Sequence, residues 1–311
     1  MQRAFDLSKT RRPLFDALVE AAHTYGPKKP ILEDQERNPL TYTDLIRAAF
    51  ALGRKIAALT EKGERVGVLL PTSSAGVVTF FALHAFGRVP VMLNFTAGLR
   101  NLRAAVKLAG VKRVLSSHRF VEQGKLHDVI DALESSCEIT YLEAVRASIG
   151  LPDRLYALAA SLAPRRFRVA SDPDSPGVIL FTSGSFGAPR GVILTQANLL
   201  ANAAQIAAHI ELLPEWVFFN PLPIFHCFGM TAGFILPLSM RATAFSRLIF
   251  DQMLLRPRGV NFCSHASGLW LCFCPSIQPK QSAVSMASAY ETDGLPDAFF
   301  ASCNHIPEDV R

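Results

Sequence analysis

The residues from Phe181 to Gly191 have the types and spacing that could bind a phosphate group. Six of these eleven residues are Gly, Ser or Thr, and apolar runs precede and follow them. Glycines allow tight turns that bring backbone N–H groups close to a ligand, hydroxyls donate further hydrogen bonds, and Arg190 adds a fixed positive charge. The glycine spacing fits neither a Walker A loop nor a dinucleotide-binding fingerprint. On composition alone, a turn joining two strands is the simpler explanation.

This run resembles the phosphate loop of the adenylate-forming (AMP-binding) acyl-CoA and acyl-carrier-protein synthetases, Thr-Ser-Gly-Ser-x-Gly-x-Pro-Lys-Gly-Val. Residues 182–192 match it, with Arg190 in the lysine position and Phe186 at the variable position. Arginine donates in a planar fork where lysine acts as a point charge, so the exchange at Arg190 changes the geometry of a phosphate contact without abolishing it. Phe186 removes a possible hydroxyl donor and adds bulk at the tip of the loop.

Other segments resemble further motifs of the same family, in the same order. Residues 194–202 are similar to its Ser/Thr-His-x-Asn-Leu-x-x-Asn helix start, with Gln196 replacing the histidine, and residues 221–229 are similar to its Pro-Leu-Phe-His-x-Phe-Gly element. Residues 40–45 and 63–71 resemble its two early motifs. Among these synthetases the chain resembles the acyl-carrier-protein synthetase part of the bacterial 2-acylglycerophosphoethanolamine acyltransferases, and the resemblance stops near residue 241.

The resemblance implies a site for ATP and a fatty acid, with Mg²⁺ shielding the phosphate charge. The residues implied to hold the β- and γ-phosphates are Thr182, Ser183, Gly184, Ser185, Gly187, Arg190 and Gly191. Those implied to line the acyl pocket are Phe225, His226, Phe228 and Gly229. A histidine among aromatic residues is also typical of core packing, so both interpretations of His226 stay open. It is not expected to act as a general base, because the attacking carboxylate is already ionised at pH 7.

Other parts of the family's site have no counterpart in this sequence. No Tyr-Gly-x-Thr-Glu segment occurs to bind adenine and the metal, no Thr-Gly-Asp binds the ribose, and no catalytic residue or metal ligand is identified. We therefore expect a truncated, N-terminal part of an AMP-forming ligase that joins a fatty acid to acyl carrier protein or CoA, inactive as it stands. The alternative is a non-catalytic remnant or a regulatory binding module of the same fold.

Charge and cysteine content exclude several other classes of function. The formal net charge is +6, but the basic residues are scattered and lack the interleaved aromatics of a single-strand nucleic-acid platform. The small basic clusters at residues 9–12, 28–29 and 165–168 are explained by solvated faces and linkers, or by contact with anionic lipid or an acidic carrier protein. The resemblance also implies a lysophospholipid or a membrane surface as a partner. Six cysteines with one close pair, Cys272 and Cys274, and no paired histidine spacing argue against a zinc site.

The location expected for the chain is the cytoplasm or the periphery of the inner membrane, because no secretory signal opens the sequence. Residues 66–94 carry a single charge, Arg88, and could be mistaken for a membrane span. Pro71, Gly76 and Pro90 interrupt the apolar run, so a strand, a helix and a second strand explain it better. A membrane-anchored scaffold built on this run stays the less favoured alternative.

The order of the expected elements predicts an α/β fold. Buried-type strands at 65–70, 89–94 and 111–116 alternate with helices at 73–86 and 99–108, which predicts a parallel sheet with helices on its faces. Two amphipathic helices flank a short β segment in residues 13–59, with Thr43 and Asp44 as a cap. Residues 148–174 have a linker-like composition. Strands at 178–181 and 191–194 enclose the phosphate loop, and a long helix begins at Thr195.

Three regions follow from these patterns. We predict a first α/β subdomain and linker at 1–168, the phosphate-loop part of a second, incomplete α/β subdomain at 169–242, and a divergent, poorly ordered tail at 243–311. The tail shows neither helical nor alternating periodicity, so it offers no strand pattern with which to complete a sheet. An incomplete sheet leaves unpaired backbone groups at its edge, and we expect proteolysis to begin after residue 241.

Overall fold

The computed structural model describes residues 10–34, 38–183, 189–209, 216–220, 222–239, 247–250 and 272–275. All of them belong to one unit of the chain, Met1–Leu255 with Trp270–Ser276.

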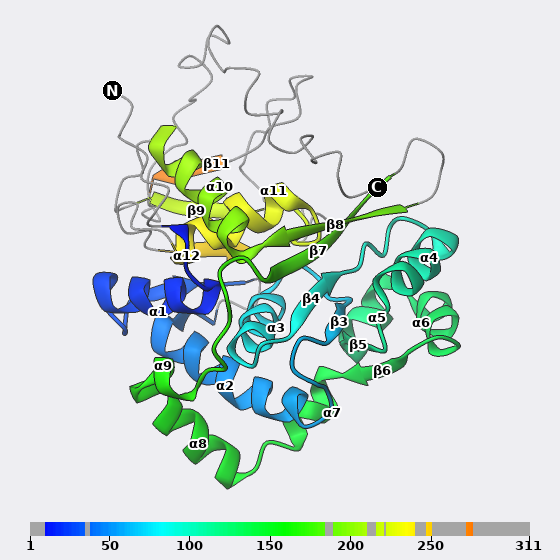
Figure 1. The fold of residues 1–311 in the computed structure, drawn as a ribbon, viewed down its shortest axis with the longest axis horizontal. Coiled ribbons are helices and arrows are strands. Elements are labelled where there is room, and N and C mark those ends of the chain that lie inside the picture. Colours follow the sequence, from blue (N-terminus) through cyan, green and yellow to red (C-terminus); the bar gives the residue numbers. More distant parts are fainter. Residues whose placement is uncertain are drawn as a thin grey trace, which may run out of the picture. The chain divides into compact units, whose positions relative to one another are not determined.

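A six-stranded mixed sheet organises this unit (Figure 1). Its spatial order is β6-β5-β3-β4-β7-β8, and all neighbours are parallel except β7 and β8, which form an antiparallel hairpin. The strands are β3 (Arg65–Val68), β4 (Val89–Met92), β5 (Arg113–Ser116), β6 (Glu138–Tyr141), β7 (Pro176–Ser183) and β8 (Pro189–Thr195). The predicted α/β fold with a mostly parallel sheet is confirmed. The first sheet also includes the two strands that enclose the phosphate loop.

Helices cover the sheet and connect its strands. They are α1 (Leu14–Tyr25), α2 (Tyr42–Ala57), α3 (Ser74–Ala85), α4 (Leu99–Ala109), α5 (His118–Gly124), α6 (His127–Glu134), α7 (Leu142–Ala147) and α10 (Gln196–His209). A small hairpin of β1 (Pro30–Leu32) and β2 (Leu40–Thr41) precedes α2. Helix α2 begins earlier than the sequence predicts, because its cap is Thr41 rather than Thr43. The Thr41 hydroxyl accepts from the Asp44 N–H at 3.1 Å, and the Asp44 carboxylate accepts from the Thr41 N–H.

The apolar run at 66–94 is β3, α3 and β4, in the centre of the fold. Helix α3 is buried on nearly all sides, which is why its sequence lacks a polar face. Arg88, the single charge of the run, is buried, and its guanidinium donates to Thr60 Oγ1 at 3.0 Å and to the carbonyl oxygens of Ala57, Thr60 and Phe86. The predicted strand–helix–strand arrangement is confirmed. Among the residues that the structure describes, no helix is long and apolar enough to cross a membrane.

The interpretation of residues 148–174 as linker-like is wrong for its first part. This part forms α8 (Leu151–Leu162) and the short α9 (Pro164–Phe167). The prolines of this part stand in the first turn of each helix. A backbone N–H there has no partner within the helix, so proline, which has no N–H, loses no hydrogen bond. The Asp153 carboxylate also accepts from the Gly150 N–H at 3.0 Å, which stabilises the start of α8.

A second, three-stranded sheet involves parts of the chain where the sequence shows no strand pattern. Strand β9 (Trp216–Asn220) pairs in parallel with β10 (Arg247–Phe250) and antiparallel with β11 (Cys272–Pro275). Most of residues 243–311 lies outside the described part of the chain, and the three-region division stays a prediction.

Candidate functional site

The β7–β8 hairpin presents the phosphate-loop run. Phe181 pairs with Gly191, Thr182 with Arg190 and Ser183 with Pro189, so the predicted residues on the two strands face each other at the end of the hairpin where its connecting loop begins. The side chains of Thr182 and Arg190 are exposed. The predicted loop residues Gly184, Ser185 and Gly187, together with Phe186, lie outside the described residues. A hydroxyl and a guanidinium on opposing strands are donors of the kind that a polyphosphate accepts.

The hairpin is anchored at its base. Strand β7 joins the parallel sheet where Ile179 pairs with Val91 of β4, and Val178, Ile179 and Leu180 are buried. Phe181 packs against the hydrophobic cluster that fills this part of the sheet, and Phe95 packs against the same cluster. The exposed donors therefore extend from a strand whose position is set by core packing.

Gln196, which replaces the family's histidine, has a structural role. Its side chain is 2% exposed, its Oε1 accepts from the Leu14 N–H at 2.9 Å, and its Nε2 donates to Ser175 Oγ at 2.9 Å. These bonds join the start of α10 to the start of α1 and to the connector before β7. The backbones of Gly177 and Gln196 lie close together, since a Cβ on Gly177 would be 2.9 Å from the Gln196 backbone nitrogen.

The element at 221–229 is held by two polar residues that the sequence analysis did not single out. Thr72 Oγ1 donates to the Leu222 carbonyl at 3.3 Å and accepts from the Ile224 N–H at 3.2 Å. The buried Asn220 donates from Nδ2 to the Gly229 carbonyl at 3.0 Å, and its Oδ1 accepts from the Leu222 N–H at 3.2 Å. A polar residue directly after a buried strand was the available signal for Thr72.

After this element the chain continues as α11 (Cys227–Met230), a π-helical turn (Thr231–Ile235) and α12 (Leu236–Ser239). The π-helical turn packs closely against Asn220, because a Cβ on Gly233 would lie 2.1 Å from Asn220 Nδ2. Gly229 is equally constrained, with Pro223 O 2.3 Å from the position of a Cβ. Glycine is required at both positions for steric reasons.

The predicted acyl-pocket residues lie beside an aromatic cluster. The Phe225 ring is 5.2 Å from the Phe95 ring, edge to face, and Phe95 is 5.0 Å from Phe120. Phe225 is buried, Phe228 is half-buried and Gly229 is buried. His226 lies 4.8 Å from the Phe225 ring but is exposed, so packing in the core does not explain it. Partial desolvation by its neighbours lowers the pKa of His226.

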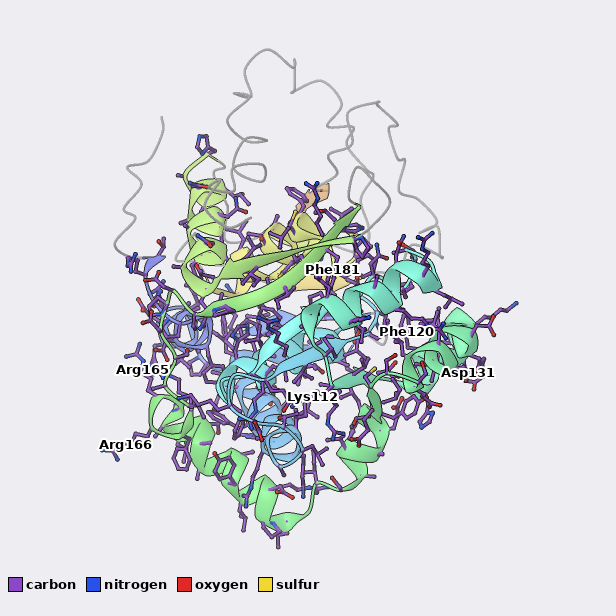
Figure 2. The ribbon with its side chains drawn as sticks, turned by 45° about the vertical axis from the view of Figure 1, so that its right-hand side comes forward. Lys112, Phe120, Asp131, Arg165, Arg166 and Phe181 are labelled. Atoms are coloured by element: carbon purple, nitrogen blue, oxygen red, sulfur yellow. The ribbon has the colours of Figure 1, made fainter. Side chains whose placement is uncertain are left out.

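Several of these groups follow the carboxyl ends of parallel strands. Thr72 follows β3, Phe95 follows β4, Phe120 belongs to the helix after β5, and the hairpin extends the carboxyl end of β7. Figure 2 shows the side chains of Phe120 and Phe181 with the elements that carry them. In open α/β sheets ligands bind at this edge. The structure thus brings one part of the phosphate hairpin and the predicted pocket residues to the same edge of the sheet.

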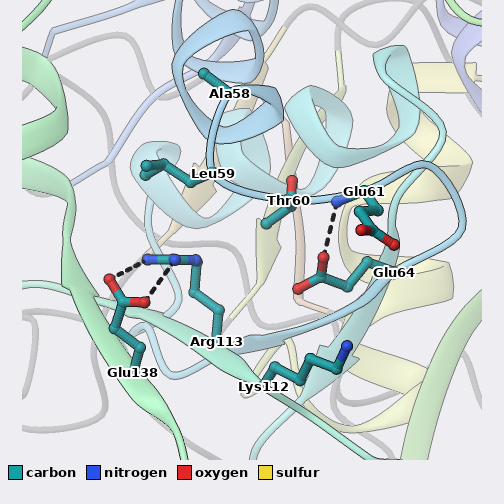
Figure 3. Close-up of a pocket in the computed structure, with 8 residues that line it drawn as sticks. All are labelled: Ala58, Leu59, Thr60, Glu61, Glu64, Lys112, Arg113 and Glu138. Carbon is teal, nitrogen blue, oxygen red and sulfur yellow. Dashed lines mark hydrogen bonds and ion pairs between the residues drawn. The ribbon is translucent and has the colours of Figure 1, made fainter.

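A cavity of about 390 Å³ lies at the opposite, amino edge (Figure 3). Arg113, the first residue of β5, makes a double ion pair with Glu138, the first residue of β6, at 2.6 Å, and Lys112 lies beside them. The Glu64 carboxylate accepts from the Glu61 N–H at 2.7 Å. None of the predicted site residues lines this cavity, so it is not the candidate site.

No group of three or more His, Cys, Asp or Glu residues that could hold a metal ion occurs within the described ranges. At the hairpin end, the Thr182 hydroxyl and the Arg190 guanidinium can both donate hydrogen bonds to phosphate oxygens.

Fold and site together define an α/β protein with a glycine- and serine-rich hairpin at the carboxyl edge of a parallel sheet. The AMP-binding enzyme family matches residues 18–254, and the chain belongs to this family. It is 28% identical over 297 residues to a sulfoacetate–CoA ligase of Cupriavidus necator, covering 84% of this chain and 56% of that protein. It is 29% identical over 236 residues to the 3-[(3aS,4S,7aS)-7a-methyl-1,5-dioxo-octahydro-1H-inden-4-yl]propanoyl:CoA ligase of Mycobacterium tuberculosis, covering 72% of this chain and 44% of that protein.

Solved structures agree on the fold. The O-succinylbenzoate coenzyme A synthetase of Bacillus subtilis, in complex with AMP, superimposes with a TM-score of 0.61 at 18% identity and covers 76% of this chain and 55% of that one. The chain thus spans about half the length of these relatives. The predicted family is confirmed.

Proposed function

We propose that this chain is the N-terminal part of an ATP-dependent, AMP-forming ligase that joins a fatty acid to the thiol of acyl carrier protein or CoA. The observation that carries the proposal is the β7–β8 hairpin, which places Thr182 and Arg190 opposite each other at the carboxyl edge of the sheet. Membership of the AMP-binding family, with CoA ligases among the similar proteins, supports this assignment.

In this proposal the hairpin would hold the outer phosphates of ATP, and Mg²⁺ would shield their charge. The fatty-acid carboxylate attacks the α-phosphorus, the bond to pyrophosphate breaks, and the acyl-adenylate forms. A thiolate then attacks the acyl carbon and AMP leaves. The carboxylate is already ionised at neutral pH, so the first step needs charge stabilisation and positioning rather than a base. Arg190, with its two-pronged guanidinium, would supply that stabilisation together with Thr182 and Ser183.

The aromatic surroundings of Phe225 support an apolar acid as substrate. Phe95 and Phe120 extend the cluster away from the exposed His226, which suits an alkyl chain better than a small charged acid. The acceptors we propose are acyl carrier protein, CoA or a lysophospholipid. The proposed location is the cytoplasm at the periphery of the inner membrane.

We further propose that the chain as it stands does not complete the reaction. Phosphate contacts without the partners for adenine and ribose cannot assemble the transition state. The second candidate function, a non-catalytic binding module, is favoured by the same missing motifs, and it predicts that nucleotide binding is also lost.

A measurement of nucleotide binding distinguishes the two candidate functions. We expect the full chain with Mg²⁺ to bind ATP in isothermal titration calorimetry, Arg190→Ala to weaken binding by about tenfold, and Arg190→Lys to retain it. Arg100→Ala, an exposed arginine of α4, is the matched control and should bind as the natural chain does. Equal binding by Arg190→Ala and the natural chain would refute the phosphate role of the hairpin. Pyrophosphate exchange above background with a panel of fatty acids would refute the predicted inactivity.

A further inference from the structure

Helix α8 presents an apolar stripe on the side that faces away from the fold. The stripe consists of Leu151, Leu155, Leu158 and Leu162, which are 69%, 56%, 44% and 81% exposed. With about 100° between successive helical residues, these four leucines fall within an arc of roughly 60°. The buried residues of α8, among them Asp153, Ala157 and Ala160, occupy the opposite side.

The inner side of α8 is firmly attached to α2. Lys55 Nζ makes an ion pair with the Asp153 carboxylate at 2.7 Å, and the Arg54 guanidinium lies 4.6 Å from the centre of the Tyr156 ring. Tyr156 also contacts Phe50, with 6.4 Å between ring centroids. The orientation of the helix is therefore fixed by its inner face, and the exposure of the leucine stripe does not result from a loosely placed helix.

Arginines flank the leucine stripe. Arg154 lies next to it on α8, and Arg165 and Arg166 follow on α9, all three exposed. Figure 2 shows Arg165 and Arg166 at the periphery of the fold. The single acidic residue of the segment Leu151–Phe167 is Asp153, which is buried and paired with Lys55. The outer face of α8 and α9 therefore combines exposed leucines with positive charge that no exposed carboxylate of the segment balances.

We infer that this face docks on the surface of a membrane that contains anionic phospholipids. The leucine stripe would enter the boundary between head groups and acyl chains by about 5–10 Å, and the three arginines would contact lipid phosphates. The stripe is a ridge on one helix, which a fluid bilayer covers without a complementary groove. Protein interfaces, by contrast, are rich in aromatic anchors, and only Phe167 of this segment is an exposed aromatic residue. The inference does not depend on the proposed ligase activity, because it uses none of the site residues.

Vesicle flotation with the full chain tests this inference. We expect the chain to float with vesicles that contain phosphatidylglycerol, much less with vesicles of phosphatidylcholine alone, and less as salt rises. The double variants Leu155→Asn/Leu162→Asn and Arg165→Glu/Arg166→Glu should each bind at least about tenfold more weakly. Because these side chains are exposed, both variants should keep the circular dichroism and urea midpoint of the natural chain.

Helix α4 offers matched controls. Leu99 and Leu108 are also exposed leucines, and Arg100 and Lys107 are exposed cations of the same helix. The variants Leu99→Asn/Leu108→Asn and Arg100→Glu/Lys107→Glu should float as the natural chain does. The inference is overturned if the natural chain does not float, or if the control variants lose as much binding as the α8 variants. A dimer in sedimentation equilibrium that Leu155→Asn/Leu162→Asn dissociates would assign the face to a second copy instead.

Discussion

Acidification should destabilise this protein through one buried histidine. His84 lies near the end of α3, 4% exposed, with its ring 4.6 Å from that of Phe80. Its imidazole hydrogen-bonds to the backbone of Gly177, and its Nε2 has no hydrogen-bond partner within the described part of the chain. Burial lowers the pKa of His84 to about 4, since the charged imidazolium loses its hydration there.

The size of the effect follows from proton linkage. The unfolded chain protonates this histidine near its ordinary pKa of about 6.5, whereas the folded chain resists protonation until about pH 4. Between these values the unfolded state binds more protons, so stability falls as pH falls. At 1.36 kcal/mol per pH unit, His84 should cost about 2 kcal/mol between pH 7.5 and pH 5, and about 3 kcal/mol by pH 4.

Urea unfolding at a series of pH values measures this. We expect the variant His84→Leu, which cannot be protonated, to lose about 2 kcal/mol less stability than the natural chain between pH 7.5 and pH 5. The free energy of unfolding of the variant at a single pH does not test the reasoning, because leucine packs differently from histidine. The change of that free energy with pH does test it. His23→Gln, at an exposed position of α1, is the control and should follow the natural chain. Parallel curves for the natural chain and His84→Leu would refute the reasoning.

Two further substitutions test the packing around the site and the core. Asn220→Ala should cost about 2–4 kcal/mol in urea unfolding, because the buried Gly229 carbonyl and the half-buried Leu222 N–H lose their partner, while Asn198→Ala at an exposed position should cost clearly less. Equal losses would show that Asn220 does not hold the pocket element. Gly53→Ala should destabilise by about 1–3 kcal/mol in spite of better helix propensity, because its Cβ would lie 2.5 Å from the Phe86 ring. Gly150→Ala, whose Cβ would have ordinary contacts at 3.6 Å, should be nearly neutral, and a similar loss there would contradict the steric explanation.

The sheet could be predicted because its strands are encoded locally. Residues 65–70, 89–94 and 111–116 are short apolar runs separated by helices, and this order alone favours parallel pairing. The long helix predicted from Thr195 is found as α10, and its residues Leu199, Ala203 and Ile206 are buried. The segment at 148–174 was misjudged because its prolines were taken as breaks, although proline in the first turn of a helix is favourable.

The candidate site was likewise predicted from the sequence only in part. Its phosphate run and its Phe225–Gly229 element are contiguous in the sequence, and their resemblance to a family is visible without a fold. Thr72, which holds the second element in place, was missed because the backbone groups it bonds to, at Leu222 and Ile224, come within reach only in the fold. Asn220 was missed although its partners Leu222 and Gly229 are near in the sequence, because strand β9, which ends at Asn220, was not predicted. The role of Gln196 was also hidden, since its main partners are Leu14 and Ser175.

The sequence by itself determined the family, the α/β class and the glycine-rich run, because each is written in residues that are neighbours along the chain. Only the tertiary structure decided that this run extends from the edge of the first sheet and that Gln196 ties α10 to α1. It also decided that α8 turns its leucines outward while Asp153 pairs with Lys55. These outcomes depend on contacts between residues many positions apart, which form only when the whole sheet and its helices bury their apolar faces together.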